Sequence, residues 1–175
     1  MSADSRVERY VHSASRPDAN LNRRDRVSEP LLVQPGDGRA ARVFDAVLSI
    51  KATAGETVGA YSLVEGTFQP NGFAPLPHVH RAEEEAFYVV DGAFDFRVAD
   101  ATVRGTTGSF LVVPRGTLHG FANAGSSPAT LIFIHSPGLD GFFVELAELA
   151  ASGPRDPAKI RSLMEAWGME VPANP

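Results

Sequence analysis

Cysteine is absent from the 175 residues of the chain. This absence excludes disulfide frameworks, cysteine-ligated zinc or iron–sulfur sites, and thiol nucleophiles. Long apolar runs are also lacking, and residues 1–22 are polar and charged, without the apolar core of a secretory leader. We therefore expect a soluble protein with a cytoplasmic location and no membrane partner.

An excess of positive charge is lacking as well. The chain carries 16 Lys and Arg against 21 Asp and Glu, so its formal net charge is −5 and nothing attracts it as a whole to nucleic acid. Arginines do gather in residues 1–30, but acidic residues are interspersed with them and no series of aromatic residues accompanies them. A basic nucleic-acid-binding arm is the alternative for this segment; we favour a solvated tail that becomes ordered against a partner subunit.

Residues 31–137 have the pattern of an all-β domain. Short runs rich in Val, Ile, Phe, Tyr and Thr alternate with clusters of Gly, Pro, Asn and Asp, which is typical of a sandwich or barrel. The expected strands cover 43–51, 59–68, 85–90, 93–98, 109–113, 119–123 and 129–135. Asp91-Gly92 predicts a hairpin turn, and Pro114-Arg115-Gly116 predicts a second tight turn.

Residues 138–175 are predicted to be a helical extension. One helix is expected over 141–151 with Asp140 as its cap, and a second is expected to begin at Pro157 with Asp156 as its cap. Apolar residues of the second helix recur at helical spacing, from Ile160 to Trp167. This stripe can either line a ligand cavity or pack the helix on the outside of the barrel, and we favour packing outside.

Three histidines and a glutamate in the β region predict a metal site. His78 and His80 alternate on one strand and so share a face, Glu85 begins the inward face of the next strand, and His119 follows the turn at Gly116. Neutral imidazoles with one carboxylate suit a divalent first-row metal. Glu84 is the rival of Glu85 as ligand, but strand parity favours Glu85. The alternative is that these histidines are hydrogen-bonded structural residues without a metal.

Two segments of the chain resemble the two signatures of the cupin family. Gly72, five residues, His78-Val79-His80, four residues, Glu85, six residues and Gly92 form the first. Gly108, five residues, Pro114-Arg115-Gly116, two residues, His119, three residues and Asn123 form the second. The amino-acid sequences of both segments are most similar to those of single-domain cupins grouped with the quercetin 2,3-dioxygenases.

The resemblance implies a double-stranded β-helix, or jelly-roll barrel, with one divalent metal held by His78, His80, Glu85 and His119. The resemblance does not identify this metal, and iron, nickel, manganese, cobalt and zinc are the candidates. It further implies a homodimer and a dioxygenase acting on a flavonol or another enolisable aromatic compound, with Glu85 as the catalytic base. A cyclase or isomerase that uses the metal as a Lewis acid, and a non-catalytic ligand-binding cupin, are the alternatives.

The expected partner is a hydrophobic or aromatic small molecule, together with O₂. Strand parity and aromatic content predict a substrate pocket, although core packing is the alternative for each of its residues. The predicted lining is Phe87, Val89, Phe121, Tyr61, Phe96 and Ile132.

Overall fold

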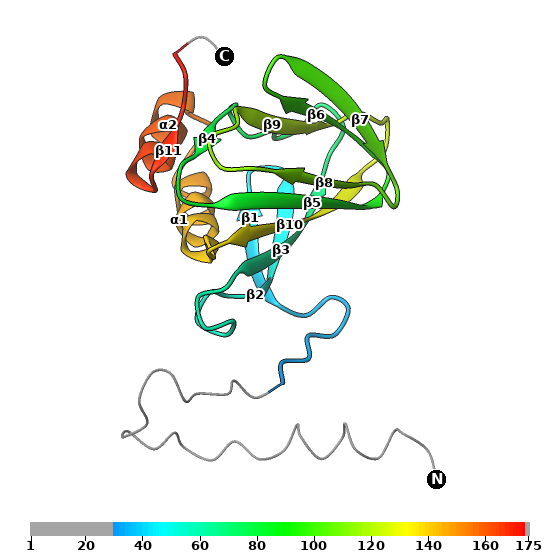
Figure 1. Ribbon diagram of the computed structural model, residues 1–175, viewed down its shortest axis with the longest axis vertical. Helices are drawn as coiled ribbons and strands as arrows, with labels where there is room; N and C mark the ends of the chain where they lie inside the picture. The colour runs from blue at the N-terminus through cyan, green and yellow to red at the C-terminus, as the bar shows by residue number, and fades with distance from the viewer. Residues whose placement is uncertain (1–29, 174–175) are drawn as a thin grey trace. The chain divides into compact units, whose positions relative to one another are not determined.

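A computed structural model of the chain describes residues 30–173 (Figure 1). It confirms a mostly β architecture followed by two C-terminal helices. The elements are β1 (Arg39–Val43), β2 (Ala46–Ala52), β3 (Ser62–Phe68), β4 (Val79–His80), β5 (Glu84–Asp91), β6 (Ala93–Val98), β7 (Ala101–Thr106), β8 (Phe110–Val113), β9 (His119–Asn123), β10 (Ala129–Ser136), α1 (Asp140–Ala151), α2 (Pro157–Ala166) and β11 (Met169–Glu170). The expectation for the N-terminal tail concerns residues 1–29, which lie outside the described part.

The strands form two main antiparallel sheets and one short pair. The six-stranded sheet has the order β1-β2-β3-β10-β5-β8, and the three-stranded sheet has the order β7-β6-β9. The pair β11-β4 joins the end of the chain to the strand that carries His80. Figure 1 shows α1 and α2 together at one end of the sheets, beside β4 and β11.

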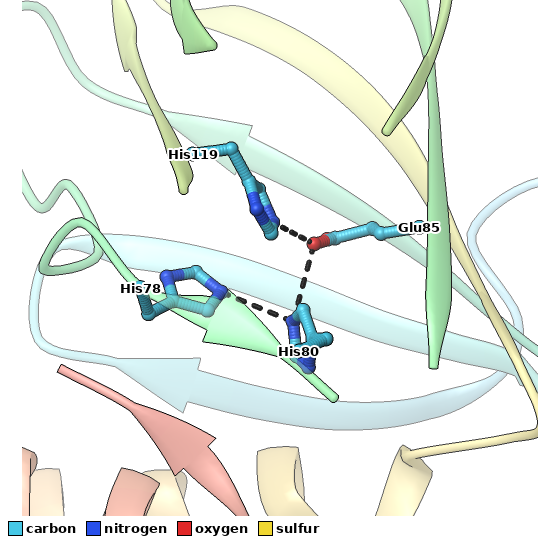
Figure 2. Close-up of side chains that lie close together, drawn as sticks. All are labelled: His78, His80, Glu85 and His119. Carbon is cyan, nitrogen blue, oxygen red and sulfur yellow. Dashed lines mark hydrogen bonds and ion pairs between the residues drawn. The ribbon is translucent and has the colours of Figure 1, made fainter. Parts of the chain in front are cut away.

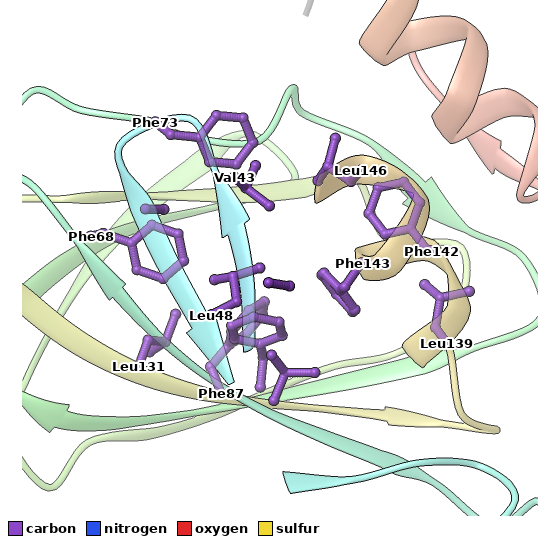
Figure 3. Close-up of a cluster of buried hydrophobic side chains, with 14 of the residues drawn as sticks. Val43, Leu48, Phe68, Phe73, Phe87, Leu131, Leu139, Phe142, Phe143 and Leu146 are labelled. Carbon is purple, nitrogen blue, oxygen red and sulfur yellow. The ribbon is translucent and has the colours of Figure 1, made fainter. Parts of the chain in front are cut away.

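The core lies between the inward faces of the sheets and the apolar face of α1. Along β10 every second residue is buried, and β5 alternates in the same way. Each fully buried Val, Leu or Phe side chain stabilises the fold by about 1.5–3 kcal/mol. Labelled members of this core in Figure 3 are Val43, Leu48, Phe68, Phe73, Phe87, Leu131, Leu139, Phe142, Phe143 and Leu146. The strands that carry the candidate metal ligands are therefore backed by a closely packed interior.

The predicted hairpin at Asp91-Gly92 is wrong. Gly92 does adopt a positive φ of 82°, but β5 before it pairs with β10 and β8, whereas β6 after it pairs with β7 and β9. The dipeptide therefore turns the chain from one sheet into the other. The pattern identified the bend but carried no information on the pairing of the strands around it.

The second predicted turn is present. The amide of Thr117 donates to the carbonyl of Pro114 at 3.2 Å, and Gly116 has a φ of 82°. This turn leads from β8 in the larger sheet to β9 in the smaller one. It therefore delivers His119 to the start of β9.

The expected strand over 43–51 covers the bend and most of the second arm of a hairpin. Its arms β1 and β2 pair in register from Val43 opposite Ala46 to Arg39 opposite Ile50. Phe44 takes a positive φ of 55° at the bend, where a residue other than glycine is unusual. No glycine or proline marks this turn, so a single long strand was the natural reading of the sequence.

The two helices occupy the predicted region. The side chain of Asp156 caps α2 by accepting from the amides of Ala158 and Lys159 at 2.9 and 3.4 Å. Asp140 is not the cap of α1, because it is already the first helical residue and its Oδ1 accepts from the amide of Ala54 at 2.7 Å. Neither described helix is long and apolar enough to cross a membrane.

Candidate metal centre

His78, His80, Glu85 and His119 converge on one buried point (Figure 2). One ligand atom from each lies within 4.8 Å of every other, and all four residues are buried. The backbone fixes this meeting, because His78 and His119 form a β-bridge with two N–H···O bonds of 2.9 Å. The two segments that the sequence marked as separate signatures are thus joined directly at their histidines.

The imidazole Nε2 atoms and one carboxylate oxygen face inward. His78 Nε2 lies 3.1 Å from His80 Nε2, and Glu85 Oε2 lies 2.7 Å from His119 Nε2 and 3.4 Å from His80 Nε2. These are the atoms that would hold a divalent ion.

The outer ring nitrogens show that the histidines suit a metal. Nδ1 of His78 donates to the carbonyl of Leu76 at 2.7 Å, and Nδ1 of His119 donates to the carbonyl of Thr117 at 2.9 Å. A carbonyl oxygen can only accept, so the proton is held at Nδ1 and the lone pair at Nε2 is left for a metal. Nδ1 of His80 lies 3.5 Å from Glu83 Oε2 and has no hydrogen-bond partner among the described residues, so backbone carbonyls fix the tautomer of two of the three histidines. The donor set therefore fits the predicted ion.

Burial and the neighbouring histidines shift the pKa values of this group. Burial alone would raise the pKa of Glu85, but the charge of His135 and hydrogen bonds from the surrounding histidines outweigh it and hold that pKa well below its usual range. Burial, reinforced by His119 and His80, lowers the pKa of His78 to about 3. Burial would lower the pKa of His119 too, yet its bond to Glu85 raises it. The centre therefore holds an ionised carboxylate and a neutral His78 at neutral pH.

A cavity of about 50 Å³ adjoins this centre. Apart from His78, His80, Glu85 and His135, its lining is apolar: Leu48, Phe68, Phe73, Pro75, Phe121, Phe133, Leu139, Phe142, Phe143, Leu146, Ile160, Met164 and Met169. An apolar cavity with a few convergent polar groups is the usual form of a small-molecule site.

The predicted pocket residues differ in where they lie. Phe121 lines the cavity, whereas Phe87, Val89 and Phe96 are buried in the core and are not part of the lining. Phe87 packs against the imidazole of His119, with ring centroids 6.2 Å apart. Core packing, the alternative weighed above, is thus what the structure shows for these three residues.

Tyr61 and Ile132 do not line this cavity either. Tyr61 precedes β3 and is 42% exposed. Ile132 lies on β10 between the buried Leu131 and Phe133, so alternation along the strand turns it to the opposite face.

Most of the lining residues were not predicted, and two groups of them bear on the site. Ile160 and Met164 of the apolar stripe on α2 line the cavity together with residues of α1. The helices therefore pack outside the sheets, as predicted, and also form part of the cavity wall. The other omission is His135, which the parity of β10 places inward with Leu131 and Phe133.

The comparisons relate this fold and its histidine–glutamate group to the cupins. Residues 64–135 match the family model described as a cupin domain, a range that contains all four candidate ligands. The fold is the double-stranded β-helix predicted from the sequence, which is the fold of the cupins.

Three solved structures share this fold. KdgF from Halomonas sp. aligns with a TM-score of 0.55 and 23% identity over 64% of this chain and 98% of that one. An RmlC-like cupin from Shewanella frigidimarina gives 0.53 and 21% over 61% and 90%, respectively. A predicted oxalate decarboxylase from Thermotoga maritima gives 0.57 and 15% over 61% and 99%. At identities this low, the alignments show a common fold and nothing more.

A curated plant protein is similar in sequence. Germin-like protein 1-1 from Oryza sativa subsp. japonica is 30% identical over 118 residues, which cover 63% of this chain and 52% of that protein. The match therefore spans about half the length of the plant protein.

Proposed function

We propose that the protein is a metal-dependent cupin oxygenase that acts on a flavonol or another enolisable aromatic compound with O₂. One observation carries the proposal: a buried group of three histidines and a glutamate adjoins a cavity with an otherwise apolar lining. The polar group supplies metal ligands, and the walls suit a planar hydrophobic molecule. The cytoplasmic location expected from the sequence stays a prediction.

The residues of the chain have distinct roles in this proposal. His78 and His119 offer Nε2 lone pairs to the ion, His80 turns its Nε2 toward the same point, and Glu85 offers Oε2. When bound, a divalent metal acts as a Lewis acid on a substrate hydroxyl and lowers its pKa. Glu85 is ionised because its pKa is held well below its usual range. The same shift makes it a weak base, so it can accept the proton only of a hydroxyl that has itself been made acidic. The phenylalanine walls exclude water from the reacting group.

The volume of the cavity limits the size of the substrate that it can hold without rearrangement. A volume of about 50 Å³ is small for a flavonol, since ligand pockets usually measure about 300–1,000 Å³. Phe142 and Phe143 of α1 and Met164 of α2 belong to the part of the wall that the helices contribute. We propose that these side chains move aside for a flavonol, whereas smaller enolisable aromatics need less rearrangement.

Oxygen uptake tests the proposal directly. We expect metal-loaded protein mixed with quercetin to consume O₂ while the flavonol absorbance disappears, and chelator-treated protein to do neither until divalent metal is restored. Turnover at the same rate without O₂ would instead identify a cyclase or isomerase. Saturable quercetin binding without any product would identify a ligand-binding cupin.

We also propose that two copies of the chain associate through the outer face of the six-stranded sheet. Phe110 of β8 is 62% exposed there, and its register partner Tyr88 of β5 is exposed as well. Next to this pair, Ala86 lies opposite both Val112 and Ile134. A continuous apolar sheet face of this kind marks an association surface.

Replacing Phe110→Glu should convert a dimer into a monomer, because two carboxylates would be buried against apolar neighbours. Sedimentation equilibrium measures the change. Val103→Glu is the matched control, since Val103 is an exposed valine on β7 of the other sheet. A wild-type protein that sediments as a monomer, or a dimer unaffected by Phe110→Glu, contradicts this assignment.

A further inference from the structure

His135 contacts the candidate metal ligand Glu85 without belonging to the ligand group. It lies on β10 directly opposite Glu85 of β5 in the sheet register, and its side chain is 2% exposed. Its Nε2 lies 3.1 Å from Glu85 Oε1. The group whose ligand atoms all lie within 4.8 Å of one another does not include it.

The two oxygens of Glu85 have different partners. Oε2 faces His119 Nε2 at 2.7 Å and His80 Nε2 at 3.4 Å, whereas Oε1 faces His135. An ionised carboxylate only accepts hydrogen bonds, so His135 donates through Nε2. A donor fixed on Oε1 opposes rotation of the carboxylate and exchange of its two oxygens.

Packing alone does not account for a histidine at this position. The imidazole lies among aromatic rings, with centroids 6.1 Å from Phe133 and 5.5 Å from Phe143. Its Nδ1 is buried without a hydrogen-bond partner among residues 30–173, an unfavourable arrangement for a polar atom. An apolar side chain would fill the same space without that cost, so the Nε2 donor is what distinguishes histidine here.

We infer that His135 is a positioning residue for the metal centre: it holds Glu85 Oε1 so that Oε2 alone is presented to the metal with the three histidines. The inference rests on the proposed metal site. Outer hydrogen-bond partners of metal ligands typically change affinity about 10–100-fold when removed.

An isosteric pair of variants separates this role from packing. In His135→Gln the amide nitrogen can take the place of Nε2 and still donate to Glu85, whereas in His135→Asn the shorter amide reaches only the place of Nδ1. Co²⁺ is the probe: its dissociation constant is measured by competition with a chromophoric chelator, and its visible absorption reports the ligand geometry. Unfolding of the metal-free proteins measures their stability separately.

We expect His135→Gln to bind Co²⁺ within about threefold of wild type with an unchanged spectrum. His135→Asn should bind about 10–100-fold more weakly, with a changed spectrum. If His135→Asn does not fold, His135→Phe replaces it, since phenylalanine keeps a ring and lacks the donor.

Three other results would contradict the inference that His135 is a positioning residue. Wild-type affinity and spectrum in the variant without the donor overturn the positioning role while leaving the metal site intact. Equal losses in His135→Gln and His135→Asn overturn it too, because the ring and not the donor is then required. A wild-type protein that binds no Co²⁺ removes the proposed metal site itself, and the inference with it.

Discussion

His119→Ala is expected to weaken divalent metal binding by more than about 100-fold, since loss of an outer partner alone typically costs about 10–100-fold. The change removes the Nε2 donor that β9 supplies and leaves Glu85 Oε2 without its 2.7 Å partner. The β-bridge to His78 uses backbone atoms only, so the remaining ligands keep their places. The dissociation constant of Co²⁺, measured by competition with a chromophoric chelator, reports the loss.

Arg115→Ala is the control for this variant. Arg115 lies in the turn before β9 and is exposed, and its guanidinium donates to the carbonyl of Ser136 at 3.3 Å. The control therefore alters the same turn while all four candidate ligands remain. Metal affinity that is equal in His119→Ala and Arg115→Ala would show that His119 does not bind the ion.

The convergence of the four candidate ligands could be predicted because each step uses a local rule. Alternation along a strand put Glu85, and not Glu84, on the inward face, and the structure has Glu85 buried and Glu84 exposed. The proline and glycine around Arg115 marked the turn that brings the chain back at His119. Local rules and two motifs of fixed spacing were enough for these positions.

The cavity wall could not be predicted in this way, because it depends on how distant elements pack. The apolar stripe of α2 had the right period, but periodicity says only that Ile160 and Met164 are buried, not what they are buried against. Tyr61 and Ile132 were assigned to the pocket although their facing depended on strand boundaries that were not known. The same limit explains the error at Gly92, where a residue that permits positive φ was read as evidence of strand pairing.

His135 illustrates a different limit of prediction from the sequence. Its position at the end of an apolar strand was visible in the sequence, and the parity of β10 would have placed it inward. Recognising its contact with Glu85 also requires the pairing of β10 with β5, which links residues 50 positions apart. Side-chain hydrogen bonds across such pairings depend on register, and no local pattern in the chain specifies this one.

Glu85→Gln is expected to lower turnover of an enolisable substrate about 10²–10⁴-fold while some metal remains bound. The amide oxygen can still face the ion, and the three histidines are unchanged. However, a neutral amide has no basic oxygen to accept the substrate proton, and it brings a donor into a place where Glu85 now accepts from His135. Rates are compared at equal metal occupancy, set by elemental analysis, so that lost metal is not counted as lost catalysis.

Glu84→Gln provides the matched control for Glu85→Gln. It removes the same charge one residue earlier on β5, where the side chain is exposed and lies outside the candidate ligand group. Turnover should therefore stay near the wild-type rate in Glu84→Gln. If Glu85→Gln at full metal occupancy keeps that rate as well, proton acceptance belongs to another group, and Glu85 acts only as a ligand. If it loses both metal and activity in proportion, the same conclusion holds, because the carboxylate is then needed for binding and not for the proton.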